Sequence, residues 1–459
     1  SKANTDVPAG YYPDALVPMS AIVEYEHNKI KANENQGIYV NVETEIDQEP
    51  GVYTGTLIID FKDFTVPVPV TVNVFDVAVS EATHAKTVFL PTWVYMHGEL
   101  DSSQRALDAY IDTMIEYRLS PSELFVDKDY SNKRLEEFVE KAYELLQNPK
   151  LSCINIPLQS TTHLPFNAEI FEKTLRLMAK KSFETNFNMF EKSVCYDAAM
   201  DEPKGQAIPI EDVRESSRRF NTTIAKLVEE FTNDDTITSE IKDEIIVSLS
   251  KIPHIITNWI TPDYSYKEED PMGYINAYCP TFDRLSTEAA INQYKEAYGF
   301  SELWWYGCNV PVSPYVSYHL EYEDTLSPRL LSWMQAEYGI AGNLYWGVNA
   351  YGLREDYFNY NSSSKSSPHM EGILFYPGGQ YGLENPIASM RLEAIRDGME
   401  EYELLYALKE KYIELGLPAD EFISAMRKGL YSGSQVLADV ESFDVARLTL
   451  LEASVAATS

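Results

Sequence analysis

The chain has 459 residues, of which 44% are hydrophobic, so it is long enough for a large domain with smaller additions and a substantial core. Its 71 acidic and 37 basic residues give a net charge of −34, and no basic cluster offsets it, which excludes nucleic-acid phosphates as a partner. No run approaches the roughly 20 apolar residues that a membrane-spanning helix needs.

Residues 1–84 predict an all-β domain. Apolar and polar residues alternate in Ile38–Val42, and valine recurs at every second position through Val66–Val74. Pro67 and Pro69 cannot donate ladder hydrogen bonds, which indicates an edge strand. We predict an accessory β-sandwich over residues 1–84, truncated at its N-terminus.

From residue 85 to residue 415, short apolar runs alternate with longer segments of helical period. Eight runs are candidate strands: Thr87–Leu90, Glu123–Val126, Cys153–Ile156, Val194–Tyr196, His254–Thr257, Tyr274–Tyr278, Leu303–Tyr306 and Asn343–Trp346. Helical segments follow most of them, although the link between the fifth and sixth lacks a clear helix. Eight such units predict a (β/α)8 TIM-type barrel over residues 85–415, and residues 416–459 predict a C-terminal helical cap.

The four cysteines give no sign of a metal site. Cys153, Cys195, Cys279 and Cys308 lack metal-ligand spacing and lie in apolar, strand-like segments. We expect buried, reduced thiols, no bound metal and no other cofactor.

Asp201 and Glu202 are adjacent carboxylates that precede Pro203, just after the fourth predicted strand. Taken alone, such a triplet is typical of a solvated turn. In a barrel, however, the carboxyl ends of the strands form the active site, and both side chains can reach one ligand where a strand ends. The position therefore predicts a catalytic pair that divides acid and stabiliser roles.

Further candidates for ligand contact follow the other predicted strands. They are Trp93, Trp259, Tyr278, Tyr306, Asn309, Trp346 and Asn349. Each aromatic side chain taken singly is equally compatible with core packing. Together, a mouth with several Trp and Tyr and few basic groups predicts a neutral, polyhydroxylated ligand, because aromatic faces stack on the apolar faces of sugars.

The stretch from residue 303 to residue 404 resembles the C-terminal part of glycoside hydrolase family 123 and its related uncharacterised proteins. The resemblance rests on Trp304–Cys308, Arg329–Trp333, Gly342–Asn349, Tyr376–Gly378 and, most specifically, Ser389–Glu403. With the Asp-Glu-Pro triplet and the upstream β-domain, it spans nearly the whole chain. Charges within Arg391–Glu403 follow helical spacing, which indicates a structural ion-pair network beneath the barrel.

The resemblance implies a retaining exo-β-N-acetylgalactosaminidase that removes terminal β-linked GalNAc from glycans or glycolipids. Glu202 would be the general acid/base, and Asp201 would orient the 2-acetamido group, whose carbonyl oxygen attacks the anomeric carbon in place of an enzyme carboxylate. Asp201 as an anion would accept the amide N–H, and its charge would help to keep Glu202 protonated. Asn276 stands where many relatives are expected to have an acid, which could change sugar preference.

Two alternatives stay open. One is a β-N-acetylhexosaminidase with another sugar preference, and the other is a non-catalytic glycan-binding protein, against which the acid pair argues. A glycan substrate makes an exported protein the expectation (periplasmic, cell-surface or secreted), with the signal peptide absent from this chain. The oligomeric state is left open.

Overall fold

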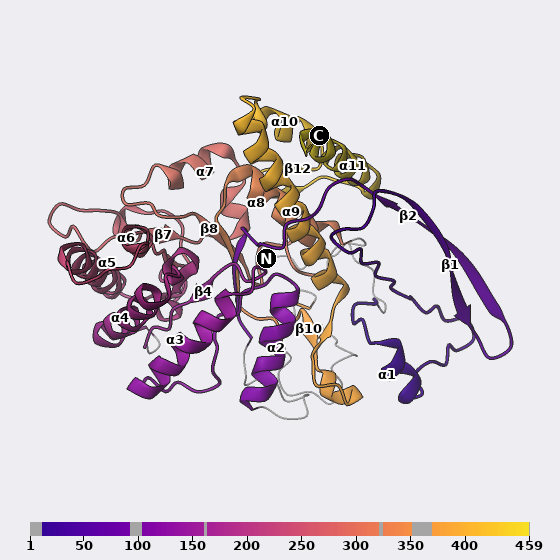
Figure 1. Ribbon diagram of the computed structural model, residues 1–459, viewed down its shortest axis with the longest axis horizontal. Helices are drawn as coiled ribbons and strands as arrows, with labels where there is room; N and C mark the ends of the chain where they lie inside the picture. The colour runs from indigo at the N-terminus through magenta and orange to yellow at the C-terminus, as the bar shows by residue number, and fades with distance from the viewer. Residues whose placement is uncertain (1–11, 92–102, 160–162, 321–324, 351–369, 459) are drawn as a thin grey trace.

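The computed structural model describes residues 12–91, 103–159, 163–320, 325–350 and 370–458. Its N-terminal part holds a short helix, α1 (Met19–Glu24), and a hairpin of β1 (Gly51–Asp60) and β2 (Thr65–Val74) that projects from one side of the molecule (Figure 1). The hairpin is antiparallel throughout, from the pair Gly51↔Val74 to the pair Asp60↔Thr65. The predicted period-two strand is therefore confirmed.

The predicted β-sandwich is not confirmed. Within residues 12–84 the structure describes no second sheet for the hairpin to pack on, and apolar side chains such as Val52, which is 68% exposed, reach solvent. An alternating pattern indicates that one face of a strand is apolar, but it does not say what covers that face.

Seven parallel strands form two sheets. One has the order β4-β5-β6-β7 and the other β3-β9-β8. Their bounds are β3 (Lys86–Phe89), β4 (Ile154–Asn155), β5 (Ser193–Tyr196), β6 (His254–Ile256), β7 (Ala277–Tyr278), β8 (Trp304–Gly307) and β9 (Gly342–Tyr345). The parallel bridge Thr281↔Tyr306 joins the two sheets, and Phe89↔Pro121 extends the second one beyond β3.

In a (β/α)8 barrel each strand pairs with the strands before and after it in the chain and the last pairs with the first, and the two sheets have this order. The hydrogen-bond ladder is interrupted between β3 and β4, so a complete barrel is not confirmed. The second predicted strand, Glu123–Val126, does not form among these residues. Parallel pairing there is limited to the bridge at Pro121, which has no N–H to donate. The gap to β4 is spanned by a side chain, because Asn155 Nδ2 donates to the carbonyl of Ser122 at 3.0 Å.

The described helices pack outside the parallel strands (Figure 1). They are α2 (Gln104–Glu116), α3 (Asn132–Leu146), α4 (Ala168–Thr185), α5 (Ile210–Asn233), α6 (Lys242–Ser250), α7 (Glu288–Lys295), α8 (Leu326–Tyr338) and α9 (Met390–Glu414). Several begin at a side chain that accepts a backbone N–H, such as Ser103 before α2 and Ser389 before α9. The apolar face of α2, from Leu107 to Ile115, is buried.

After α9 the chain forms α10 (Ala419–Met426) and α11 (Val440–Thr458), both of which pack on α9 (Figure 1). The remaining strands are two short antiparallel pairs: β10 (Phe375–Tyr376) with β11 (Ile387–Ala388), and β12 (Tyr431–Ser432) with β13 (Gln435–Val436). None of the described helices combines the length and apolarity needed to cross a bilayer. The domain boundaries after residues 84 and 415 stay predictions.

The strands enclose an apolar interior that includes Val88, Val194 and the fully buried Trp304. Gly342 on β9 is required there, because a Cβ atom at this position would lie 2.4 Å from the Trp304 ring. The predicted ion-pair network is present. It includes the contacts of Arg329 with Glu401 and of Arg391 with Asp14.

Candidate active site

The acid pair lies where β5 ends. After Tyr196 the chain makes one short turn, Ala198–Met200, and Asp201 and Glu202 follow. Glu202 has a φ of +41°, in the left-handed region that residues with a side chain seldom adopt. Strain of this kind persists only where the surroundings fix it, and it concentrates at functional sites. Glu202, to which the resemblance gives the role of the acid, is one of eight described non-glycine residues with a positive φ.

Thr257, directly after β6, holds both members of the pair. Its hydroxyl donates to Asp201 Oδ1 at 2.6 Å and accepts the backbone N–H of Glu202 at 2.8 Å. Tyr196 donates a second, longer hydrogen bond to Asp201 Oδ1, at 3.3 Å. The pKa of Asp201 is raised, mainly by burial. The hydrogen bond from Thr257 lowers this pKa, the charge of Glu202 raises it, and the hydrogen bond from Tyr196 lowers it, but the net effect is an increase.

Tyr306 on β8 holds the Glu202 side chain, because its hydroxyl donates to Glu202 Oε1 at 2.5 Å. Burial, followed by this hydrogen bond, raises the pKa of Tyr306 far above that of an ordinary phenol, so the hydroxyl keeps its proton and stays a donor. Side chains from β6 and β8, which lie in the two different sheets, therefore meet at the acid pair.

A third, partly buried carboxylate, Glu371, lies at the end of β9 and was not predicted from the sequence. The chain returns to the end of β9 through the antiparallel bridge Asn349↔Ile373, and there the Trp346 indole donates a hydrogen bond to Glu371. Gly372, with φ +73°, makes room for the indole, since a Cβ atom there would lie 2.5 Å from the ring. Burial raises the pKa of Glu371, and the indole hydrogen bond opposes the rise.

The thiol of Cys308 relates Glu371 to the acid pair. Burial raises the pKa of Cys308 to about 12, and the charges of Glu202, Glu371 and Asp201 all add to the increase. The three carboxylates therefore act electrostatically on the same neutral thiol. All four cysteines are unpaired as predicted, although Cys308 is only partly buried.

The other predicted contact residues have varied positions. Trp259 is 39% exposed at the end of β6, and Asn309 is exposed beside Cys308. Tyr278 is 1% exposed and Asn349 is fully buried, so neither offers surface to a ligand in this structure. Trp93 lies outside the described residues.

Two further polar clusters have structural positions. Asn276 Oδ1 accepts the backbone N–H of His254 at 2.8 Å, which ties β6 to its neighbour at the end opposite to the acid pair. Asp197, which directly follows the last residue of β5 and is buried, accepts hydrogen bonds at Oδ2 from His254, at 3.1 Å, and from Ser216. Ser216 donates to Asp197 rather than to His254, whose Nδ1 has no hydrogen-bond partner among the described residues, so the three side chains do not form a nucleophile relay.

A cavity of about 230 Å³ is lined by Tyr196, which donates to Asp201, together with Ser122, Tyr130 and Asn155, but neither member of the acid pair lines it. A larger groove of about 1150 Å³ lies between residues 39–50 and α9, and neither Asp201 nor Glu202 lines it. Within the described ranges, no group of three or more His, Cys, Asp or Glu side chains has the arrangement of a metal site.

The catalytic-domain model of glycoside hydrolase family 123 matches residues 137–408, more than half of the chain. Among solved structures, a family 123 glycoside hydrolase from Clostridium perfringens, analysed for glycolipid glycan hydrolysis, is similar over 90% of this chain and 76% of its own, with 14% identity and a TM-score of 0.47. A truncated 3-deoxy-D-arabino-heptulosonate 7-phosphate synthase from Thermotoga maritima is similar over 79% of this chain and 94% of its own, with 10% identity and a TM-score of 0.19. No curated protein matches.

The matched segment contains Asp201, Glu202, Thr257, Tyr306 and Glu371, so the whole cluster built above belongs to the catalytic domain of the family. Hydrolysis of a glycosidic bond needs a carboxyl group that gives and takes a proton, and the matched segment includes both members of the acid pair. The chain therefore belongs to glycoside hydrolase family 123.

Proposed function

We propose that this glycoside hydrolase removes terminal β-linked N-acetylgalactosamine with retention of configuration, using the substrate's own 2-acetamido group as the nucleophile. The observation that supports this most directly is that the two adjacent carboxylates receive different numbers of hydrogen bonds. Asp201 receives two side-chain hydroxyl hydrogen bonds, whereas Glu202 receives one, from Tyr306. A carboxylate that holds a fixed charge is stabilised by several hydrogen-bond donors, as Asp201 is. An acid that gives and takes a proton needs an oxygen without a donor, as Glu202 has within the described part of the chain.

In the first step the acetamido carbonyl oxygen bonds to the anomeric carbon while the bond from that carbon to the glycosidic oxygen breaks. Glu202 gives its proton to the departing oxygen, and Asp201 accepts the amide N–H as positive charge develops on the oxazolinium. In the second step the oxygen of a water molecule bonds to the anomeric carbon while Glu202 takes a proton from that water. The bond from the anomeric carbon to the acetamido oxygen breaks, which opens the oxazolinium ring. Two inversions at one carbon give net retention.

The first test is a panel of aryl β-glycosides of GalNAc, GlcNAc and sugars without the acetamido group. We expect hydrolysis of the GalNAc glycoside and none of the sugars that lack the acetamido group. Turnover of GlcNAc in preference to GalNAc would instead support the alternative sugar preference. Inhibition by a thiazoline that mimics the oxazoline is expected, and indifference to it would contradict substrate assistance.

The second test is Glu202→Gln. Because the variant cannot donate a proton, we expect a roughly 10²–10⁴-fold loss of kcat on a natural disaccharide and a much smaller loss on an aryl glycoside whose leaving group needs no protonation. Equal losses on the two substrates would argue against Glu202 as the acid.

A further inference from the structure

Beyond Glu202, towards the surface, lies a cluster of one aromatic and two basic side chains, here called the rim cluster: Lys204, Trp259 and Arg284. Lys204 Nζ is 5.8 Å and Arg284 Cζ is 5.0 Å from the centre of the Trp259 ring. The three residues follow β5, β6 and β7, which are neighbours in one sheet. The rim cluster is therefore part of the same end of the sheet as the acid pair.

The charge of the rim cluster contrasts with the rest of this acidic protein. Among the described residues, no carboxylate forms an ion pair with Arg284, whose side chain is exposed. Lys204 is already paired, since its Nζ lies 3.0 Å from Asp263 Oδ2 and donates to Thr261 Oγ1 at 3.2 Å. In a chain with a net charge of −34, an unpaired guanidinium at the mouth of the site is available to an external anion.

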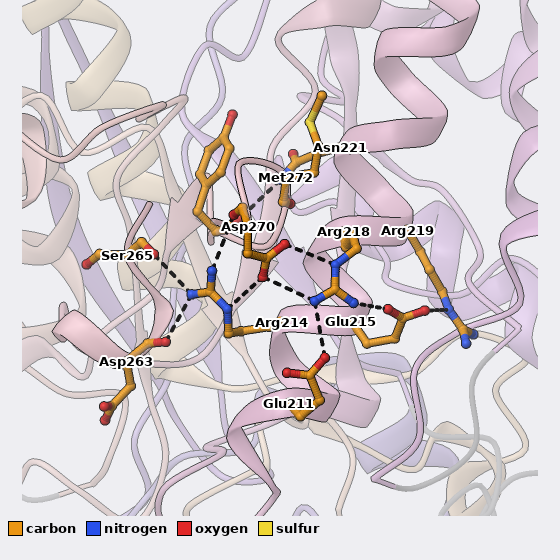
Figure 2. A network of polar contacts seen from close by, with 11 residues as sticks. Glu211, Arg214, Glu215, Arg218, Arg219, Asn221, Asp263, Ser265, Asp270 and Met272 are labelled. Carbon is orange, nitrogen blue, oxygen red and sulfur yellow. Dashed lines mark hydrogen bonds and ion pairs between the residues drawn. The ribbon is translucent and has the colours of Figure 1, made fainter. Parts of the chain in front are cut away.

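A rigid ion-pair network fixes the loop that carries Asp263. Asp270 binds both Arg214 and Arg218, and Arg214 Nη1 also donates to the carbonyl of Asp263 at 3.2 Å. In Figure 2 the Asp263 carboxylate extends away from this network, which leaves it free to pair with Lys204. The network thus positions the backbone of Asp263, the residue that pairs with Lys204 in the rim cluster.

The position of the rim cluster identifies which part of a substrate it would meet. Thr257, which binds the acid pair, is buried, and two residues later Trp259 reaches the surface, so the chain runs outward from the acid pair to the rim. Under the proposed function, Glu202 lies at the glycosidic oxygen, and the group beyond that oxygen is the leaving sugar. The leaving sugar is therefore the part nearest to Trp259.

We propose that the rim cluster binds an acidic group, a carboxylate or a sulfate ester, carried by the leaving-group side of the glycan. The Trp259 ring offers an apolar contact for a sugar, and the Arg284 guanidinium can donate two parallel N–H hydrogen bonds to a planar or tetrahedral anion. The inference rests on the proposed function for its orientation. It narrows the substrate class from neutral glycans to glycans with an acidic branch next to the terminal GalNAc.

The test compares the wild type with Arg284→Gln on three substrates that end in β-GalNAc. They are a neutral disaccharide, the same disaccharide with a carboxylated branch on its second sugar, and the same disaccharide with a sulfate ester there. We expect Arg284→Gln to lower kcat/KM at least tenfold on one or both acidic substrates and less than twofold on the neutral one. The preference of the wild type for acidic substrates should weaken as salt is added.

Lys251→Gln is the matched control, because it removes one exposed positive charge near the opposite end of β6. It should leave all three rates unchanged. Equal losses on neutral and acidic substrates with Arg284→Gln would indicate a structural role and overturn the proposal, as would no loss on either acidic substrate.

The inference can fail separately from the proposed function. If none of the three substrates is hydrolysed, the proposed function fails, while calorimetric binding of the two acidic disaccharides to wild type and Arg284→Gln still tests the rim cluster. Weaker binding to the variant would support the cluster, and equal dissociation constants would overturn it.

Discussion

Thr257→Val removes the hydroxyl that both members of the acid pair use. Thr257 is 1% exposed, so water cannot readily replace its hydrogen bond to Asp201. A hydrogen bond to a charged group contributes about 1.5–3 kcal/mol. If the ionised form of Asp201 is the active one, kcat/KM measured at pH values below the pKa of Asp201 should fall about 10- to 150-fold.

The loss should depend on pH in a definite direction. The hydroxyl stabilises the ionised carboxylate, so its removal raises the pKa of Asp201 further above the ordinary value of 3.8. The acidic limb of the kcat/KM profile, where Asp201 becomes protonated and inactive, should therefore move to higher pH by about 1–2 units.

The assay is a pH series of kcat/KM on an aryl β-GalNAc, with melting curves to confirm folding. Thr257→Ser keeps the oxygen and should stay close to the wild type. An acidic limb at the wild-type pH in Thr257→Val, with unimpaired activity, would refute the assigned role of this hydrogen bond.

Three further changes test other contacts. Glu371→Ala releases the Trp346 indole and should shift tryptophan fluorescence and raise KM about tenfold; unchanged fluorescence and KM would contradict a role for this pair at the site. Asp14→Asn leaves the buried Arg391 without its charge partner and should cost about 3–5 kcal/mol in denaturant unfolding, and a cost below 1 kcal/mol would contradict it. Gly398→Ala should destabilise by about 1–3 kcal/mol despite the better helix propensity of alanine, because its Cβ atom would lie 2.5 Å from the Arg329 carbonyl oxygen; a raised melting temperature would show that α9 can move.

Local periodicity predicted the helices and most parallel strands, because each buries one face whose spacing is visible in the sequence. It also placed Asp201 and Glu202 correctly at the end of β5. The same reasoning could have separated Tyr306 from Tyr278. Tyr306 packs inside the strands with Ala277, whereas Tyr278, one position after Ala277, points to the opposite side and packs outside them. The end of a strand indicates which residues lie near the mouth, whereas an odd or even position within the strand decides on which side the side chain lies.

Other parts of the site have no local signal. Glu371 reaches the mouth only because the chain returns to pair Asn349 with Ile373, and no periodic run precedes it. Asp14 meets Arg391 because residues 15 and 16 pair with the segment before α9. Such contacts depend on tertiary pairing between distant segments, which neither propensity nor spacing encodes.

The contacts of Glu202 also assign the oxygen that carries the transferable proton in the proposed mechanism. Tyr306 is a donor to Oε1, and the raised pKa of its hydroxyl keeps it so. Oε1 is thus occupied as an acceptor, and the proton of the acid belongs on Oε2. Gly205 lies beside Oε2, because a Cβ atom at this position would be 3.5 Å from that oxygen. The glycosidic oxygen should therefore approach Glu202 from the Oε2 side, with Tyr306 behind it.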